Sequence, residues 1–372
     1  MPLVELTPST DNIHRASCFF SDRQRRLQTN MHQDIAAVVE PLLAQNSLPP
    51  GALRAAITAL MNGQCSDAEI GSLLTAIAFR GETDQDLAEA ATVMREKATS
   101  VPVTRQKLLD TCGTGGDRLH SFNISTAAAI VAAACGIPVA KHGNRQASSS
   151  SGSADVLEAL GVNLQISAEQ AGQCIDEIGI GFCFARVLHP AMKHVAEVRR
   201  SLGFRTIFNL LGPLSNPAKA EFQLIGASRN STAEKLAGAI ARLGTTRTLV
   251  VCGADQLDEV SLWGTTRVID VTGSKTSVSG WTATDLGLPT CTPADLVARS
   301  PQESADIIRA IFDGRPGPRR DIVVANSAAA LMTAGKVDSL KGGVIASQQA
   351  IDSRAAADKL EELIRWTQKR PS

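Results

Sequence analysis

Residues 113–126 read GTGGDRLHSFNIST, and this segment predicts a phosphate-binding turn between a strand and a helix. A short apolar run at Leu108 and Leu109 leads into the glycines, and an alanine-rich helix is expected to begin at about Ser125. Glycine lets backbone N–H groups approach an anion closely and adopt a positive φ. The N-terminus of the following helix directs unpaired N–H groups and a positive dipole end to the same place. Because such a turn can also serve strand-to-helix geometry alone, its function depends on the clusters downstream.

Residues 104–372 alternate short apolar runs with helical patterns, which predicts an α/β domain. The apolar runs are typical of strands that are covered on both faces. They lie at 137–140, 180–185, 222–227 and 248–252. Helices are expected to start at 167 and 231 and to return near 304–313, 325–335 and 354–368. This order favours a mainly parallel sheet, flanked by helices and connected by right-handed crossovers.

Residues 31–103 show helical patterns only, which predicts a small N-terminal all-helical domain. S-x-x-E at 66–69 and T-x-x-D at 83–86 are typical of capping boxes at helix N-termini. We expect helices near 190–210 to join this domain. The preceding residues 1–30 are expected to form a polar, mobile tail.

The composition is that of an ordinary globular protein. The chain has 372 residues, enough for two domains, and 44% of them are hydrophobic. Its 37 basic and 37 acidic residues balance, so we expect no general attraction to nucleic acid or to a membrane surface. The eight cysteines form no C-x-x-C pair, which disfavours a zinc site and a compact disulfide framework. With no signal-peptide pattern and no apolar run approaching the roughly 20 residues that span a bilayer, we expect a cytoplasmic protein.

Two polar segments follow the predicted strand 137–140. The first, KHGNR at 141–145, is expected beyond the carboxyl end of that strand, where α/β sheets bind ligands. Lys141 can supply a charge to a phosphate and Asn144 an orienting amide, although a solvated basic turn is the alternative. The second, SSSSGSAD at 148–155, opens a helix and predicts another anion site. A flexible serine linker is less favoured there because an apolar helix follows at once.

Two further clusters supply a basic and an acidic group. His189 directly precedes a helix predicted over 190–202, and Arg199 within that helix can pair with a carboxylate through a bidentate fork. A solvated or ion-paired arginine is the alternative. The adjacent acids Asp258 and Glu259 suit Mg²⁺, which prefers oxygen ligands and bridges to substrate phosphates, although most acid pairs are surface residues. No histidine metal motif, G-x-S-x-G elbow or Walker lysine is present, which favours phosphate chemistry without a protein nucleophile.

In this order, the clusters resemble the motifs of the anthranilate phosphoribosyltransferases, enzymes of tryptophan biosynthesis. The resemblance covers the chain from about residue 33 to the C-terminus. It rests on the segments 113–117, 141–145, 151–155, 189–193 and 209–217. It implies a helical domain joined to a larger α/β phosphoribosyltransferase domain, and a homodimer formed mainly through the helical part. It also implies Mg²⁺-dependent transfer of the phosphoribosyl group from phosphoribosyl pyrophosphate to the amine of anthranilate, with release of pyrophosphate and no covalent enzyme intermediate.

The resemblance assigns a role to residues of each segment. Those implied to bind phosphoribosyl pyrophosphate are Gly113, Gly116, Asp117, Ser121, Asn123, Ile124, Ser125, Thr126, Lys141, His142, Gly143, Asn144, Arg145, Gln146, Ala147, Ser148, Ser149 and Ser153. Those implied to contact anthranilate are Gly113, Asn144, His189 and Arg199. Those implied to bind Mg²⁺ are Ser125, Asp258 and Glu259.

Three positions depart from the family pattern. Cys252 stands where relatives usually carry histidine, Gln256 where they carry glycine, and Arg186 where many carry proline. The first two lie on the predicted metal loop and the third near the expected route to anthranilate. These departures put the path of the metal loop in question, although both acids are retained.

Two other functions fit the same architecture. One is a pyrimidine nucleoside phosphorylase, whose glycine motif normally begins with Lys-x-Ser, whereas residues 110–112 here are Asp-Thr-Cys. The other is a non-catalytic relative that binds nucleic acid, which would be expected to lose the metal acids and to have a basic surface. This chain keeps the acids and is neutral.

Overall fold

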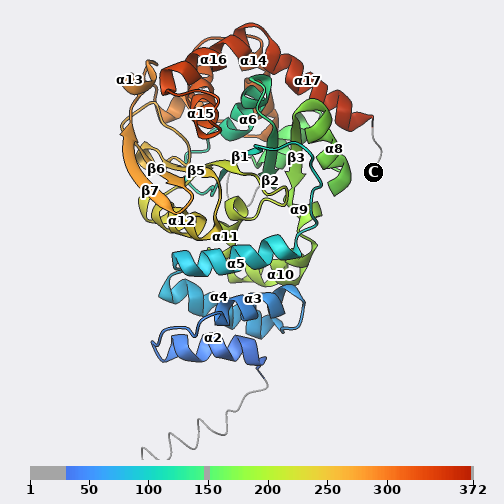
Figure 1. Ribbon diagram of the computed structural model, residues 1–372, viewed down its shortest axis with the longest axis vertical. Coiled ribbons are helices and arrows are strands. Elements are labelled where there is room, and N and C mark those ends of the chain that lie inside the picture. Colours follow the sequence, from blue (N-terminus) through green and yellow to red (C-terminus); the bar gives the residue numbers. More distant parts are fainter. Residues whose placement is uncertain (1–30, 146–150, 370–372) are drawn as a thin grey trace, which may run out of the picture.

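The computed structural model describes residues 31–145 and 151–369. A helical bundle lies at one end of the molecule and a larger α/β domain at the other (Figure 1). The expectation of a small helical domain and a mainly parallel α/β domain is therefore confirmed. The predicted tail over 1–30 lies outside the described residues. Within the ranges given above, no helix has the length and apolarity needed to cross a membrane.

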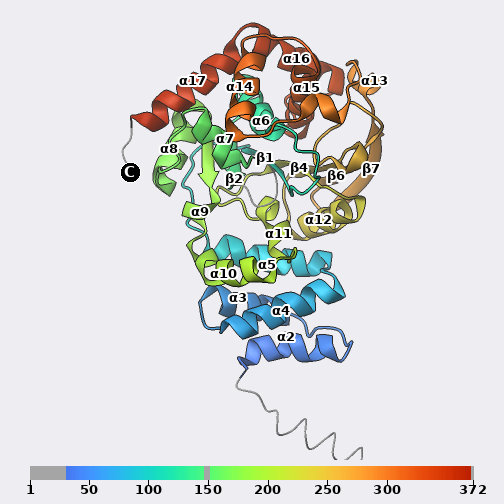
Figure 2. The same cartoon turned by 180° about the vertical axis from the view of Figure 1, so that it is seen from behind.

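The helical bundle is built from four consecutive helices and two helices that come from later in the chain. The consecutive helices are α2 (Gln33–Leu43), α3 (Ala52–Met61), α4 (Asp67–Arg80) and α5 (Asp84–Lys97). Ser66 with Glu69 and Thr83 with Asp86 form the predicted capping boxes, which satisfy N–H groups at the starts of α4 and α5. The later helix α10 (Lys193–Leu202) packs against α3 and α4, and α11 (Phe208–Leu211) packs against α5 (Figure 2).

The α/β domain contains one seven-stranded sheet in the order β3-β2-β1-β4-β5-β6-β7. Its strands are β1 (Leu109–Gly113), β2 (Val139–Gly143), β3 (Ile180–Phe184), β4 (Phe222–Gly226), β5 (Arg247–Cys252), β6 (Thr266–Thr272) and β7 (Lys275–Trp281). The first five strands are parallel, while β6 and β7 are antiparallel to their neighbours. The carboxyl ends of β1, β2, β4 and β5 therefore meet at one edge of the sheet.

Helices cover both faces of this sheet. Helices α6 (Ile124–Ala134), α8 (Ala168–Ile178), α12 (Asn230–Leu243) and α15 (Pro318–Thr333) contact the strands directly. The other helices of this domain are α7 (Ser153–Ala159), α9 (Ala185–Leu188), α13 (Ala283–Leu286), α14 (Pro301–Phe312), α16 (Leu340–Asp352) and α17 (Ala355–Gln368). Side chains alternate between two cores, so that Leu249 packs on the side of α6 and α15 while Val250 packs on the side of α12 and the bundle. Burial on both faces explains the apolar residues of β3 and β5, whereas β1, β2 and β4 also bury the polar residues Asp110, Lys141, His142 and Gln223.

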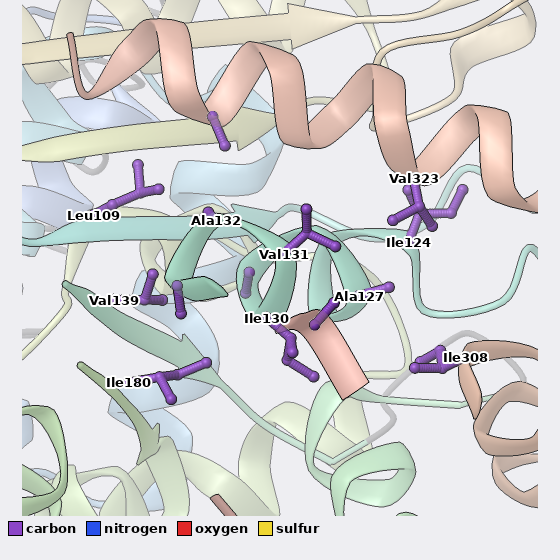
Figure 3. Close-up of a cluster of buried hydrophobic side chains, with 14 of the residues drawn as sticks. Leu109, Ile124, Ala127, Ile130, Val131, Ala132, Val139, Ile180, Ile308 and Val323 are labelled. Carbon is purple, nitrogen blue, oxygen red and sulfur yellow. The ribbon is translucent and has the colours of Figure 1, made fainter. Parts of the chain in front are cut away.

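Helix α6 runs through the centre of the first core. It is apolar on all sides, as expected for a helix buried within a domain. Figure 3 shows Ile130 and Val131 of α6 among Leu109 and Val139 of the strands, with Val323 of α15 on its other side. Full burial of a side chain such as Ile130 contributes roughly 1.5–3 kcal/mol. This packing holds the N-terminus of α6 beside the end of β1.

The strands and helices differ from the sequence expectation at several ends. Strand β2 begins at Val139, so Lys141, His142 and Gly143 lie inside the strand and not in a loop after it. Pro138 has no N–H to donate to the ladder, so the strand starts one residue later. It continues through Gly143 because Lys141, His142 and Gly143 pair in register with Phe182, Cys183 and Phe184 of β3. A 3₁₀ turn over Pro190–Met192 precedes α10, so the helix expected over 190–202 begins three residues late.

Other elements were not foreseen. Ser231 does not cap α12, which begins at Asn230 after Arg229 without a side-chain cap. The hairpin of β6 and β7 is absent from the expected strands, because its outer strand is polar and exposed and lacks the apolar pattern. Helix α16 contains Gly342 and Gly343, residues that weaken a helical pattern. It is stabilised by packing against α15.

Candidate active site

A cavity of about 320 Å³ lies at the carboxyl ends of β1 and β2 and is bordered by Ala185, which follows β3, and by Asp258 and Glu259 from the loop after β5. It gathers most of the residues that the motifs predicted. These are Gly113, Gly116, Asp117, Ser121, Asn123, Ile124, Ser125, Lys141, His142, Gly143, Asn144, Arg145, Ser153, Arg199, Asp258 and Glu259. A second cavity, of about 310 Å³, lies between α14 and α15 and is lined by none of the predicted residues.

Four predicted residues cannot be placed, and two lie elsewhere. Gln146, Ala147, Ser148 and Ser149 fall outside the described residues. Thr126 is buried on α6, and His189 is buried; neither lines the cavity. The cavity is also lined by residues that the motifs did not predict as ligand contacts, namely Cys112, Thr114, Gly115, His120, Phe122, Ser151, Gly152, Ala185, Arg205, Phe208, Asn209, Gly212 and Pro213.

The glycine turn forms one wall of the cavity. Gly115 and Gly116 have φ values of 65° and 83°, in the region that favours glycine. The N–H of Gly115 donates to the Asp258 carboxylate at 2.7 Å. A Cβ on Gly113 would lie 2.4 Å from the same carboxylate, so a larger residue there would displace it. The turn thus places Asp258 directly beside its exposed N–H groups.

The N-terminus of α6 forms a second wall. Asn123 donates to the carbonyl of Ser151 at 3.1 Å and accepts from the Ser304 hydroxyl at 2.8 Å, which ties the start of α6 to the segment before α7 and to α14. The N–H of Ser125 donates to the Glu259 carboxylate at 3.0 Å. Two helix N-termini, each favourable to an anion, therefore border the same cavity.

Three carboxyl groups meet between these walls. Burial raises the pKa of Asp117 and of Asp258, and the charge of Asp117 raises the pKa of Asp258 further. Burial and the charge of Asp258 raise the pKa of Glu259. Partly buried acids that disfavour one another's charge would be stabilised by a bound cation.

The carboxylates of Asp258 and Glu259 suit Mg²⁺ better than a metal ion whose ligands all come from the protein. Among the described residues, no cluster of three or more His, Cys, Asp or Glu side chains is arranged to hold a metal. Mg²⁺ typically keeps several waters and takes one or two carboxylates together with substrate phosphates. Asp258 and Glu259, with the nearby Ser125 hydroxyl, supply that kind of donor set.

Lys141 is held by a buried polar network beneath the cavity. Its ammonium group donates to the carbonyl of Thr111 at 2.5 Å. Asp110 accepts from the His142 N–H at 3.0 Å and from the Asn216 amide at 2.8 Å. Burial raises the pKa of Asp110 to about 6, while the charge of Lys141 opposes this rise. Asn216 thus acts through hydrogen bonds that orient β1 and β2, away from the cavity wall.

His189 lies behind His142 and reaches the cavity only through it. The Nε2 atoms of the two rings are 3.2 Å apart, and His142 Nδ1 lies 3.0 Å from the carbonyl of Gly212. Because a carbonyl only accepts, we infer that His142 carries its proton on Nδ1 and accepts from His189 at Nε2. Burial lowers the pKa of His142 to about 4 and that of His189 to about 3, which keeps both rings neutral near pH 7.

Arg199 projects from the last turn of α10 into the cavity. Its guanidinium carbon lies 5.3 Å from the centre of the Phe208 ring, a cation–π contact. Burial lowers its pKa. Within the ranges described, no carboxylate or carbonyl is hydrogen-bonded to its guanidinium, so the fork is available to a carboxylate ligand.

Comparison with known proteins identifies the family to which this arrangement belongs. The profile described as glycosyl transferase family, a/b domain, matches residues 105–357, and the one described as glycosyl transferase family, helical bundle domain, matches residues 36–98. The chain is 46% identical to the anthranilate phosphoribosyltransferase of Syntrophotalea carbinolica, over 91% of this chain and 99% of the relative. It belongs to the anthranilate phosphoribosyltransferase family. The chain is also 46% identical to the anthranilate phosphoribosyltransferase of Chromobacterium violaceum, over 90% of this chain and 98% of that enzyme.

Solved structures of anthranilate phosphoribosyltransferases share the fold. The Thermus thermophilus enzyme superposes with a TM-score of 0.84 at 42% identity, covering 89% of this chain and 99% of its own. The Saccharomyces cerevisiae enzyme, solved in complex with phosphoribosyl pyrophosphate and Mg, superposes with a TM-score of 0.85 at 27% identity. That match covers 92% of this chain and 100% of the yeast chain.

The three departures from the anthranilate phosphoribosyltransferase pattern have different settings. Gln256 has a φ of 66°, so this loop keeps a left-handed conformation although a glutamine replaces the usual glycine. Cys252 is buried at the end of β5. Arg186, on α9, is exposed and does not line the cavity. Despite the first two changes, Asp258 of this loop accepts from the Gly115 N–H and Glu259 accepts from the Ser125 N–H.

Proposed function

We propose that the protein transfers the phosphoribosyl group of phosphoribosyl pyrophosphate to the amine of anthranilate, giving N-(5-phosphoribosyl)anthranilate and pyrophosphate. The observation that carries this proposal is a single cavity in which a glycine turn, two helix N-termini and an acidic pair face Arg199, which has no carboxylate partner among the residues described. The first three features suit a diphosphate with its metal, and the last suits an aromatic carboxylate. Family membership supports the same reaction.

The phosphoribosyl pyrophosphate site is proposed along the turn 113–117, the start of α6 and the segment 141–145. Backbone N–H groups of the turn and of α6 would donate to phosphate oxygens. Lys141 would contribute positive charge from its buried position between β1 and β2. Gln146, Ala147, Ser148 and Ser149 are proposed to complete this site, as is Ser153 at the start of α7.

The anthranilate site is proposed beside Arg199, Asn144 and Gly113. Arg199 would pair with the carboxylate, which places the amine toward the glycine turn. His189 is proposed to act on this site through His142, since the ring of His142 lies between His189 and the cavity. The Saccharomyces cerevisiae enzyme, solved in complex with 4-fluoroanthranilate, supports a site for this class of ligand.

The residues present suit a direct displacement without a covalent enzyme intermediate. An aromatic amine is uncharged and nucleophilic at neutral pH, so its approach to C1 of the ribose needs orientation more than a strong base. When bound by Ser125, Asp258 and Glu259, Mg²⁺ supplies positive charge to the pyrophosphate and helps to orient it. The turn and the helix N-termini would stabilise the charge that develops on the leaving group.

Removal of the acidic pair tests the proposed reaction. The double variant Asp258→Asn with Glu259→Gln is expected to lower turnover by about 10²-fold or more and to keep its fold, because both substitutions preserve shape and remove mutual repulsion. The assay follows the decay of anthranilate fluorescence after addition of phosphoribosyl pyrophosphate, with and without Mg²⁺. Turnover close to that of the unchanged protein would contradict the metal site. Absence of any decay with folded, unchanged protein would contradict the reaction.

We further propose a homodimer formed mainly through the helical bundle. Leu43 on α2 is 76% exposed and Phe79 on α4 is 92% exposed, which is costly for apolar side chains unless a partner covers them. Sedimentation equilibrium at micromolar concentration tests the dimer, and a monomer mass would contradict it.

We also propose two domains. The helical domain comprises residues 31–103 together with helices near 190–210, and the α/β domain comprises residues 104–372. A cytoplasmic location is proposed as well.

A further inference from the structure

Arg205 contributes a cationic side chain to the cavity that none of the sequence motifs predicted. It lies between the end of α10 and the start of α11, six residues after Arg199. Its guanidinium lies against the glycine turn. A Cβ built on Gly116 would be 2.4 Å from Nη1 of Arg205 and 3.2 Å from its Cζ.

This arginine has no protein partner in the described part of the chain. Its guanidinium forms no ion pair and no hydrogen bond within residues 31–145 and 151–369, although it is close to a wall that carries three acids. Arg145, which also lines the cavity, is paired with Asp155 and Glu158. Arg200, which lies on α10 five positions before Arg205, is paired with Glu197 at 2.6 Å. Arg205 therefore differs from Arg145 and Arg200, and resembles Arg199, in that it lines the cavity with a guanidinium that has no partner among the described residues.

The glycine turn lies between Arg205 and the acidic pair. Asp258 contacts the turn at Gly113 and Gly115, whereas Arg205 contacts it at Gly116. An anion on this turn would thus meet a cation site on one side and a guanidinium on the other. A diphosphate has enough oxygens to be shared in this way, and Arg suits it through its planar fork of donors.

Arg205 and Arg199 have different surroundings, and each suits a different kind of anionic ligand. Arg199 stacks on Phe208 in an apolar setting, which suits the carboxylate of a planar aromatic ligand. Arg205 is an exposed residue against a backbone turn, with no aromatic contact among the described residues. The two arginines therefore divide the cavity into a carboxylate end and a phosphate end.

We propose that Arg205 binds the pyrophosphate group at the glycine turn and neutralises the charge that develops on it during transfer, an inference that rests on the proposed function. In that step the bond from C1 of the ribose to the pyrophosphate oxygen breaks, and its electron pair leaves with pyrophosphate. The amine lone pair forms the new C1–N bond, and the amine then releases a proton to solvent. A guanidinium close to the departing oxygens interacts more strongly as their charge increases.

The test compares Arg205→Gln, Arg205→Lys and the control Arg200→Gln. The control removes an arginine five positions before Arg205 that does not line the cavity. Titration calorimetry with Mg²⁺-pyrophosphate is expected to show Kd raised about 10-fold or more in Arg205→Gln and unchanged in Arg200→Gln. The kcat/KM for phosphoribosyl pyrophosphate should decrease about 10²-fold in Arg205→Gln, which is within the range for loss of one donor that stabilises charge in the transition state. Arg205→Lys should recover part of both losses because it keeps the charge but not the fork.

Three results would overturn the inference. One is pyrophosphate affinity in Arg205→Gln equal to that of the unchanged protein. Another is a loss that appears mainly in KM for anthranilate, which would assign Arg205 to the carboxylate. The third is an equal loss in Arg205→Lys and Arg205→Gln together with a lower unfolding temperature, which would make the role structural. Failure of the proposed reaction would be distinguishable, because the unchanged protein would then bind Mg²⁺-pyrophosphate without consuming anthranilate.

Discussion

Replacement of Gly226 by alanine is expected to displace Asp258 and so to disrupt the proposed Mg²⁺ site. Gly226 ends β4, and its carbonyl accepts from the Thr114 N–H of the glycine turn at 2.9 Å. A Cβ at this position would lie 1.6 Å from the backbone carbonyl oxygen of Asp258 and 2.5 Å from its carbonyl carbon. Because these are backbone atoms, no rotamer change can relieve the overlap.

The size of the effect follows from that distance. To reach even 3.0 Å, the Asp258 carbonyl must move by about 1.4 Å relative to β4, since packed atoms do not interpenetrate. Movement of this size would break the 2.7 Å hydrogen bond from Gly115 to the Asp258 carboxylate. A misplacement of about 1 Å can cost about 10²-fold in rate, or roughly 2.7 kcal/mol in activation free energy. Overpacking should also lower the free energy of unfolding by about 1–3 kcal/mol.

The assay measures kcat/KM for phosphoribosyl pyrophosphate across a range of Mg²⁺ concentrations, with circular dichroism as a check on folding. Gly226→Ala should lose about 10²-fold in kcat/KM and need more Mg²⁺ for half of its maximal rate. The control is Gly71→Ala on α4, where an added Cβ meets only Val198 at 3.9 Å and should not change activity. A folded Gly226→Ala variant with an unchanged Mg²⁺ response would refute the view that β4 positions Asp258.

Two further predictions concern the cavity and its histidines. Arg199→Ala should raise KM for anthranilate about 10-fold or more, by loss of a charged hydrogen bond, and should change KM for phosphoribosyl pyrophosphate far less; equal changes would argue against carboxylate binding. His142 titrates about pH 4 when folded and near 6.5 when unfolded, so the stability that it contributes is complete above about pH 6.5 and is lost as the pH falls toward 4. Urea unfolding should show about 2 kcal/mol less stability from this ring at about pH 5 than at about pH 7.5. His142→Gln should flatten that dependence, and an unchanged slope would contradict the buried neutral ring.

Much of the candidate site could be predicted because its chemistry is local in the chain. The glycine turn, the start of α6 and the acidic pair each need only a few consecutive residues of the right type. The capping boxes at 66–69 and 83–86 were predicted correctly for the same reason, since a cap joins residues three apart. The parallel order of the first five strands followed from their alternation with helices.

Other features could not be predicted because they join residues that are distant in the chain. The pairing of His142 with His189 crosses 47 positions, and the bond from Asn216 to Asp110 crosses 106. No local pattern marks either contact. The same holds for Arg205, whose role depends on its approach to Gly116 from a different part of the chain.

The sequence by itself determined the α/β class, the helical bundle and the chemical character of the site, because periodicity, caps and glycine turns act over a few residues. Only the tertiary structure decided which groups face the cavity. Parallel strands bring their carboxyl ends to one edge, so Asp258 reaches Gly115 across 143 positions. The packing of α10 and α11 on the bundle then presents Arg199 and Arg205 to that edge. Such approaches depend on the close packing of whole elements, and no short segment encodes them.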